Sequence, residues 1–262
     1  MKKAEELVSL KGKTSLITGA ASGIGKAISM RFAEAGADLV LVDIQNNKLQ
    51  ILKEELKEFK VKVKTYKVDI SKKKEIDKLW TRLEGREPDI LVNNAGIYPF
   101  KKFTEVDEDF YNNVMNINLN SMVWMCHQMI SRRIKSGGTI INTGSIEALL
   151  PFKKDLAPYS VSKAGVLALT RSLANEYGSK GFKINGIIPG GIVTPGTKSA
   201  AKGLLKFKFG LFKTAKDFTN RLSLGRLGEP DEVARVALFL ASDLSSYMSG
   251  ALVAVDGGFL SA

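Results

Sequence analysis

The sequence contains little cysteine or histidine. Cys126 is the single cysteine among 262 residues, so an intrachain disulfide is excluded. Its place in an apolar helical stretch predicts a packed core thiol and a reducing, cytoplasmic setting. His127 is the single histidine. One histidine argues against a histidine-based metal site or catalytic triad, and we expect no metal.

Long apolar runs are also missing. The longest have the length of strands, as in residues 39–42 (Leu-Val-Leu-Val), whereas a membrane-spanning helix needs roughly 20 apolar residues. The chain starts with residues 1–6, Met-Lys-Lys-Ala-Glu-Glu, and no apolar segment follows them. We therefore expect neither a secretory signal nor a membrane partner.

Negative charge is in the minority. The chain has 39 lysines and arginines against 27 acidic residues, a net charge of +12. A nucleic-acid or acidic partner is one interpretation, and a lysine-rich solvated surface is the other. We prefer the second and expect no nucleic-acid partner, because the lysines are spread out and no basic segment carries interleaved aromatic residues. Lysine alternates along residues 60–67, which predicts a half-buried strand at a sheet edge.

Strand and helix patterns alternate along nearly the whole chain. This alternation predicts one α/β domain over residues 1–262, with a parallel sheet covered by helices on both faces. The strand patterns lie at about 14–18, 39–42, 60–67, 89–92, 138–143, 183–188 and 251–255. The helix patterns lie at about 23–35, 47–58, 76–83, 108–131, 159–176 and 231–240. Residues 196–222 show no clear periodicity.

A glycine-rich loop joins the first predicted strand to the first predicted helix. It reads Thr-Gly-Ala-Ala-Ser-Gly-Ile-Gly over residues 18–25. Glycines here permit a tight turn and a close approach of the backbone to a pyrophosphate, which the helix N-terminus attracts. We predict a dinucleotide site that includes Gly19, Ser22, Gly23, Ile24 and Gly25.

Asp43 follows the second predicted strand, at the spacing expected for a ribose-binding acid. Its carboxylate can accept hydrogen bonds from the adenosine ribose and would repel a 2′-phosphate. Residues 44–46 (Ile-Gln-Asn) include no arginine that could bind such a phosphate. The sequence therefore predicts NAD(H) over NADP(H). The alternative is that Asp43 only caps the following turn.

Tyr159 and Lys163 lie four residues apart on a predicted helix, downstream of Ser145. Side chains with this spacing share a helix face, so the Lys163 ammonium can lie near the Tyr159 hydroxyl. The pKa of a free tyrosine is about 10, and a nearby cation lowers the pKa. We expect Lys163 to make Tyr159 usable as a general acid or base.

In their order along the chain, these motifs resemble the short-chain dehydrogenase/reductase family. The resemblance runs from Leu10 to about Phe259 and includes Asn-Asn-Ala-Gly at 93–96, Pro-Gly at 189–190 and the segments 225–230 and 256–258. It implies a Rossmann-type doubly wound parallel sheet of about seven strands. It also implies a homotetramer built from the long helices and the C-terminal segment.

The resemblance also implies roles for individual residues. Tyr159 would be the general acid for carbonyl reduction and the base for alcohol oxidation, while Lys163 would lower the Tyr159 pKa and bind the nicotinamide ribose. Ser145 would hold the substrate oxygen, and Asn118 would hold a water in a proton relay. Further cofactor contacts are implied at Ile44, Asp69, Ile70, Asn94, Ala95, Gly96, Pro189, Gly190, Ile192 and Thr194. The chain departs from the family pattern in reading Thr-Gly-Ser at 143–145 and in a Ser145-to-Tyr159 loop one residue longer than usual.

Two segments are candidates for the substrate pocket. Glu147 follows Ser145 by two residues and either lines the pocket or faces solvent. Residues 204–212 include Leu204, Leu205 and Phe209. They form either a lid within 196–222, which would favour apolar or aromatic substrates, or an amphipathic helix at an oligomer contact.

We therefore expect an NAD(H)-dependent oxidoreductase that interconverts secondary alcohols and ketones, with apolar or aromatic small molecules as substrates. A sugar or polyol dehydrogenase is one alternative, in which Glu147 binds hydroxyls. A 3-oxoacyl-(acyl-carrier-protein) reductase is another, which suits the basic surface but not Asp43, since such reductases usually take NADPH. Outside enzymes, the chain could be a nucleotide-sensing or nucleic-acid-binding member of the family, because fold alone does not imply turnover.

Overall fold

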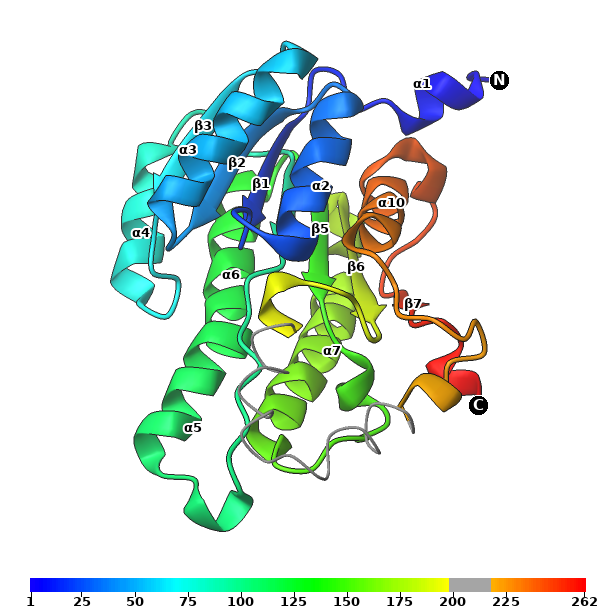
Figure 1. Cartoon of the computed structure of the whole chain (residues 1–262). Helices are drawn as coiled ribbons and strands as arrows, with labels where there is room; N and C mark the ends of the chain where they lie inside the picture. The colour runs from blue at the N-terminus through cyan, green and yellow to red at the C-terminus, as the bar shows by residue number, and fades with distance from the viewer. Residues whose placement is uncertain (198–217) are drawn as a thin grey trace.

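A seven-stranded parallel sheet forms the centre of the protein, as a computed structural model shows (Figure 1). The structure describes residues 1–197 and 218–262. The strand order is β3-β2-β1-β4-β5-β6-β7, which confirms the predicted doubly wound Rossmann-type fold. The strands are β1 (Thr14–Thr18), β2 (Asp38–Asp43), β3 (Val63–Lys67), β4 (Ile90–Asn93), β5 (Gly138–Thr143), β6 (Phe182–Pro189) and β7 (Leu252–Val255).

Helices cover both faces of the sheet (Figure 1). One face is covered by α2 (Gly23–Glu34), α3 (Asn46–Glu55) and α10 (Pro230–Ala241). The other is covered by α4 (Lys73–Arg82), α6 (Ser121–Arg133) and α7 (Ala157–Tyr177). The remaining helices are α1 (Ala4–Val8) and α5 (Glu108–Met115). Short helical turns lie at Leu56–Phe59, Phe103–Glu105, Ile146–Ala148, Gly178–Lys180, Asp243–Ser245 and Phe259–Ser261.

The two-residue alternation of strand side chains separates two buried clusters. On β1, Ile17 packs toward α2 and α10, whereas its neighbour Leu16 packs toward α4 and α6. Both residues are fully buried. Strands covered on both faces must be apolar throughout, which explains the uninterrupted apolar runs in the sequence.

Cys126 lies in the second of these clusters, on α6. It is fully buried, which confirms the predicted core thiol. Burial raises the pKa of its thiol to about 12, although hydrogen bonds with Asn93 and Asn142 act in the opposite direction. The Asn93 amide donates to the sulfur at 3.3 Å. A thiol in these surroundings stays protonated at neutral pH.

The lysine-rich strand β3 lies at one edge of the sheet, as predicted. It starts at Val63, later than the alternation suggested, because Lys60 takes a left-handed conformation (φ 57°) that ends the preceding helical turn. Lys64 and Lys67 are exposed and point away from the half-buried side chains between them. Charge on an edge strand discourages pairing with another sheet.

The long helix predicted over 108–131 is interrupted. Asp107 caps the start of α5 by accepting the Phe110 N–H at 2.7 Å. A π-helical turn, Asn116–Asn120, then separates α5 from α6. Such turns insert one extra residue into a helix and often occur at functional sites. Within the part of the chain that the structure describes, none of the helices has the length and apolar character needed to cross a membrane.

Candidate active site

The strand order reverses between β1 and β4, and the expected site lies where these two strands end. In open parallel sheets, ligands bind at the carboxyl ends of the strands at this switch point. Asn94, just past β4, ties its strand to the glycine-rich loop. Its amide donates to the carbonyls of Thr18 at 3.1 Å and Gly19 at 3.3 Å, and the Ala95 N–H donates to Thr18 Oγ1 at 3.1 Å.

Two glycines of the loop are required by close backbone approach. A Cβ placed on Gly25 would lie 2.1 Å from the Gly19 carbonyl oxygen. Gly19 has a φ of +65°, and a Cβ there would lie 2.8 Å from Ala95 Cα. Only glycine fits at either position. The loop can therefore pass tightly across the switch point and leave its backbone accessible to a dinucleotide.

The start of α2 fits a pyrophosphate. Ser22 occupies the N-cap position, yet its side chain makes no capping hydrogen bond. The first turn of α2 contains no acidic residue. The positive end of the helix dipole is thus not neutralised by its own side chains, as an anion site requires. Gly23, with a φ of +54°, brings this turn close to Thr194, whose Cβ would lie 3.3 Å from an added Cβ.

Asp43 lies at the carboxyl end of β2, with 9% of its surface exposed. One carboxylate oxygen accepts the Ala21 N–H of the glycine loop at 3.0 Å, and the other accepts the Gln45 N–H at 2.9 Å. The second contact is the turn cap that the sequence left open as an alternative. A carboxylate has about four acceptor positions, so capacity remains for ribose hydroxyls.

The other predicted cofactor residues also lie at or after the carboxyl ends of strands. Asp69 follows β3 and accepts the Ser71 hydroxyl at 2.6 Å and the Lys72 ammonium at 3.1 Å. Burial raises the Asp69 pKa, but these hydrogen bonds outweigh it, and the pKa is below its ordinary value. Gly190 follows β6 and donates its N–H to Val255 at 3.0 Å. The remainder are Ile44, Ile70, Asn94, Ala95, Gly96, Pro189, Ile192 and Thr194.

Tyr159 and Lys163 lie in the first two turns of α7. Lys163 is 3% exposed, and its ammonium donates to the carbonyl of Thr143 at the end of β5 at 2.8 Å. Burial lowers the pKa of Lys163 to about 8. The Nζ atom lies 5.9 Å from the centroid of the Tyr159 ring.

The pKa of Tyr159 moves in the opposite direction from the one the sequence suggested. The Tyr159 pKa is raised to about 12, mainly by burial; a hydrogen bond with Ser145 lowers it and nearby Glu147 raises it. The Lys163 ammonium donates its hydrogen bond to the Thr143 carbonyl. In this structure the phenol is therefore protonated at neutral pH, the state required of a general acid.

Ser145 follows β5, and its hydroxyl accepts the Glu147 N–H at 3.2 Å. Glu147 is 4% exposed, so of the two positions left open, the structure favours the interior over solvent. Its two carboxylate oxygens accept the main-chain N–H groups of Phe152 at 3.1 Å and Lys153 at 3.3 Å. Burial raises the pKa of Glu147 despite these hydrogen bonds. Glu147 thus fixes the loop beside Ser145.

Asn118 is fully buried in the π-helical turn. Its Oδ1 accepts the Ile97 N–H at 2.8 Å, and its Nδ2 donates to the Ile97 carbonyl at 3.0 Å and to Ser162 Oγ at 3.3 Å. The side chain therefore connects the segment after β4 with α7. A role in a water relay stays a prediction, since these contacts occupy the side-chain amide.

Three residues near Tyr159 were missed by the sequence reasoning. Tyr98 packs edge-on against Tyr159, with ring centroids 4.7 Å apart, and Phe100 packs edge-on against Tyr98 at 5.0 Å. Lys153 Nζ lies 5.8 Å from the centre of the Phe100 ring. The aromatic residues directly after Asn-Ala-Gly were the available signal for this wall. Leu204, Leu205 and Phe209 lie outside the described residues.

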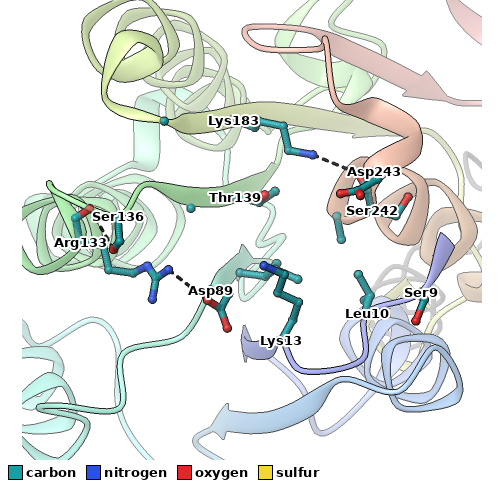
Figure 2. Close-up of a pocket in the computed structure, with 14 residues that line it drawn as sticks. Ser9, Leu10, Lys13, Asp89, Arg133, Ser136, Thr139, Lys183, Ser242 and Asp243 are labelled. Carbon is teal, nitrogen blue, oxygen red and sulfur yellow. Dashed lines mark hydrogen bonds and ion pairs between the residues drawn. The ribbon is translucent and has the colours of Figure 1, made fainter. Parts of the chain in front are cut away.

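A cavity of about 270 Å³ lies at the amino ends of the strands, the edge opposite the predicted site (Figure 2). Arg133 pairs there with Asp89 at 3.0 Å, and Lys183 donates to the Ser242 carbonyl at 3.0 Å. The cations of Arg133 and Lys183 are thus both partnered within the protein (Figure 2). None of the site residues predicted from the sequence lines this cavity.

The chain is similar to known proteins over nearly its whole length. Residues 19–260 match the protein-family model described as enoyl-(acyl carrier protein) reductase. The chain is 38% identical over 260 residues to the 2-dehydro-3-deoxy-D-gluconate 5-dehydrogenase of Bacillus subtilis, covering 97% of this chain and 96% of that protein. It is 34% identical over 254 residues to a 3-oxoacyl-(acyl-carrier-protein) reductase of Thermotoga maritima, covering 96% and 99%.

A solved structure is similar in fold as well. The L-sorbose reductase of Gluconobacter frateurii, complexed with NADPH and L-sorbose, superposes with a TM-score of 0.90 at 31% identity, covering 98% of this chain and 99% of that one. The similarity thus extends from the glycine-rich loop through the sheet to the last strand. On these grounds the chain belongs to the short-chain dehydrogenase/reductases, a family of oxidoreductases that use a nicotinamide cofactor.

Proposed function

We propose that the protein is an NAD(H)-dependent oxidoreductase that interconverts secondary alcohols and ketones. The main support is the position of Ser145, Tyr159 and Lys163, which lie together at the carboxyl ends of the strands beside the glycine-rich loop. The proposed catalytic residues are these three and Asn118. A bound nicotinamide would supply or accept the hydride.

The proton is the part of the reaction that this chain handles itself. During ketone reduction, the protonated Tyr159 hydroxyl donates to the substrate oxygen as negative charge develops there. The Ser145 hydroxyl donates a second hydrogen bond to the same oxygen. Lys163, held by Thr143, places a buried positive charge in the same site. In the oxidative direction, Tyr159 must first lose its proton.

The cofactor would extend across the switch point. The start of α2 would hold the pyrophosphate, Asp43 would hold the adenosine ribose, and Thr194 would lie near the nicotinamide. We propose NAD(H) over NADP(H) on the negative charge of Asp43 and the absence of arginine at 44–46. The NADPH of the L-sorbose reductase complex supports the opposite choice, so the preference has to be measured.

For the substrate, we favour polar ketoses over the apolar or aromatic ketones suggested by residues 204–212. The apolar expectation depends on residues that the structure does not describe. By contrast, the loop that follows Ser145 carries the buried Glu147 and the partly buried Lys153. The B. subtilis relative, named for a sugar acid, supports this class. The T. maritima relative supports the alternative of an acyl-carrier substrate.

The first test is oxidation of NADH and NADPH with a ketone panel. The panel includes ketoses, aliphatic and aromatic ketones and an acetoacetyl thioester. We expect the best turnover with a ketose, and we expect Tyr159→Phe to lower kcat by about 10²–10⁴-fold, because the phenyl ring cannot donate a proton. Cofactor titration of Tyr159→Phe by NADH fluorescence controls for folding. Equal turnover by Tyr159→Phe would remove its catalytic role.

A substitution of Asp43 tests the cofactor preference. In Asp43→Asn, the charge that repels a 2′-phosphate is lost, and we expect affinity for NADPH relative to NADH to rise by roughly tenfold or more. If the wild-type protein already binds NADPH more tightly, the proposed NAD(H) preference is wrong while the oxidoreductase assignment stands. The non-enzyme alternative predicts NADH binding without turnover, together with a salt-sensitive DNA shift.

A further inference from the structure

Lys153 lies in the loop between Ser145 and α7, and two contacts fix the position of its backbone. Its N–H donates to a buried carboxylate oxygen of Glu147 at 3.3 Å. Two residues further on, the Asp155 carbonyl accepts the Lys101 N–H at 3.0 Å. The loop that carries Lys153 is thereby tied both to the Ser145 segment and to the segment after β4.

A continuous aromatic wall connects Lys153 with the proposed general acid. Tyr98 contacts Tyr159, Phe100 contacts Tyr98, and the Lys153 ammonium lies near the face of Phe100. Burial raises the pKa of the Tyr98 hydroxyl, so this ring remains neutral. Tyr159 thus marks one end of the wall and a cation marks the other.

The Lys153 ammonium is partly buried, and its charge is poorly compensated. Burial lowers the Lys153 pKa, while Glu147 raises it through space. Both Glu147 oxygens are already engaged by main-chain N–H groups. Across residues 1–197 and 218–262, no carboxylate forms an ion pair with Lys153. A partly desolvated ammonium without an ion-pair partner favours an anionic ligand, because the pair recovers charge-assisted hydrogen bonds.

We propose that Lys153 binds a carboxylate of the substrate, so that the enzyme selects ketones and alcohols with a carboxylate at the end remote from the reacting carbon. We assign the polyhydroxy acids as the class, because they carry such a carboxylate on the same carbon chain as a secondary alcohol or ketone. This inference rests on the proposed oxidoreductase function, and it assigns Lys153 a role in specificity rather than in chemistry.

A matched pair of substrates tests the proposal. The two compounds 5-keto-D-gluconate and L-sorbose have the same carbon chain and ketone, and differ in carrying a carboxylate or a hydroxymethyl group at the far end. We expect the wild-type enzyme to have the higher kcat/KM for 5-keto-D-gluconate. In Lys153→Met, the ratio of the two kcat/KM values should fall about 10- to 100-fold, because a charge-assisted hydrogen bond is lost.

The chain offers matched controls for this experiment. Lys154, the next residue, is exposed, and Lys154→Met should leave the ratio of kcat/KM values at its wild-type value. Lys153→Arg keeps the charge and should retain most of the preference. A ratio unchanged in Lys153→Met, or lowered equally in Lys154→Met, overturns the proposal.

Calorimetric titration of D-gluconate and D-sorbitol, with NAD⁺ present, separates this inference from the proposed function. These two compounds also differ only in the carboxylate. If neither these two ketones nor any other member of the ketone panel is reduced, the proposed function is wrong. Gluconate binding that Lys153→Met weakens at least tenfold would still support the carboxylate site. Equal gluconate binding by wild type and Lys153→Met would contradict it.

Discussion

Lys163 shows how the requirements of the site oppose those of the fold. Its ammonium is buried, and a single carbonyl, that of Thr143, is its recorded hydrogen-bond partner in the described part of the chain. Burial holds its pKa at about 8, against 10.5 for an ordinary lysine. Between these two values the unfolded chain binds the proton more tightly than the folded chain does. The charged form therefore costs stability below pH 8, and this cost shrinks between pH 8 and 10.5.

The destabilisation by charged Lys163, and its decrease with rising pH, lead to a prediction about stability. Lys163→Met should raise the free energy of unfolding at pH 7 by on the order of 1–3 kcal/mol, since it removes a buried charge and also one hydrogen bond. The gain should diminish as the pH rises from 8 toward 10.5. Urea denaturation of both proteins at pH 7 and pH 10 measures it. A gain of the same size at both pH values would contradict the linkage.

Some single residues could be identified from the sequence and others could not. Tyr159, Lys163 and Gly25 have roles set by local spacing, which the sequence displays directly. Tyr98 and Lys153 belong to loops 55 residues apart in the chain. Tyr98 reaches Tyr159, and Lys153 reaches Phe100, through tertiary packing, which no local pattern encodes. The direction of the Tyr159 pKa shift was missed for a related reason, because the burial that raises this pKa is also produced by tertiary packing.

At the scale of elements, the contact between the glycine-rich loop and α2 is the tightest constraint on the cofactor site. Gly25 has ordinary helical backbone, so a substitution there tests space alone. Gly25→Ala would push its Cβ against the Gly19 carbonyl and the Asn94 amide, at 2.1 and 2.6 Å. Either α2 or the loop has to move.

We expect Gly25→Ala to lower the free energy of unfolding by about 1–3 kcal/mol, as overpacking does, and to weaken NADH binding at least tenfold. Thermal denaturation and NADH fluorescence titration measure the two effects. Gly178→Ala is the matched control, because an added Cβ there meets no atom within 4 Å. Wild-type NADH affinity in Gly25→Ala would show that the loop tolerates displacement.

Most elements were predictable from periodicity, because buried parallel strands are apolar and surface helices are amphipathic. The interruption of the helix over 108–131 was not. Residues on both sides of it continue a helical pattern, and the extra residue of the π-helical turn shifts the helix face without breaking the pattern. That shift is what directs Asn118 inward against Ile97. The position of Asn118 is thus a property of the packed elements.

At the scale of the whole molecule, α5 and α7 lie next to each other and carry exposed apolar side chains. Tyr111 on α5 is 40% exposed, and Val161 on α7 is 52% exposed. We propose that this surface joins subunits in the homotetramer implied by the family resemblance. Apolar side chains exposed together on packed helices suit such an interface.

Light scattering should therefore give a mass about four times the 28.6 kDa of one chain. Tyr111→Asp should reduce this mass, because a buried unpaired charge weakens an apolar interface. Ile51→Asp on α3 introduces the same charge at another exposed apolar position, 59% exposed, and should leave the mass unchanged. A monomeric wild-type protein at micromolar concentration would rule out the tetramer.

The burial of Cys126 has a consequence for experiments on the intact molecule. This one thiol is enclosed between the sheet and α6, and its high pKa keeps it unreactive while the core is closed. Reagents that modify thiolates can reach it only when this core opens. The rate at which such a reagent modifies Cys126 thus measures how often the fold opens at its centre, and no reporter residue has to be introduced.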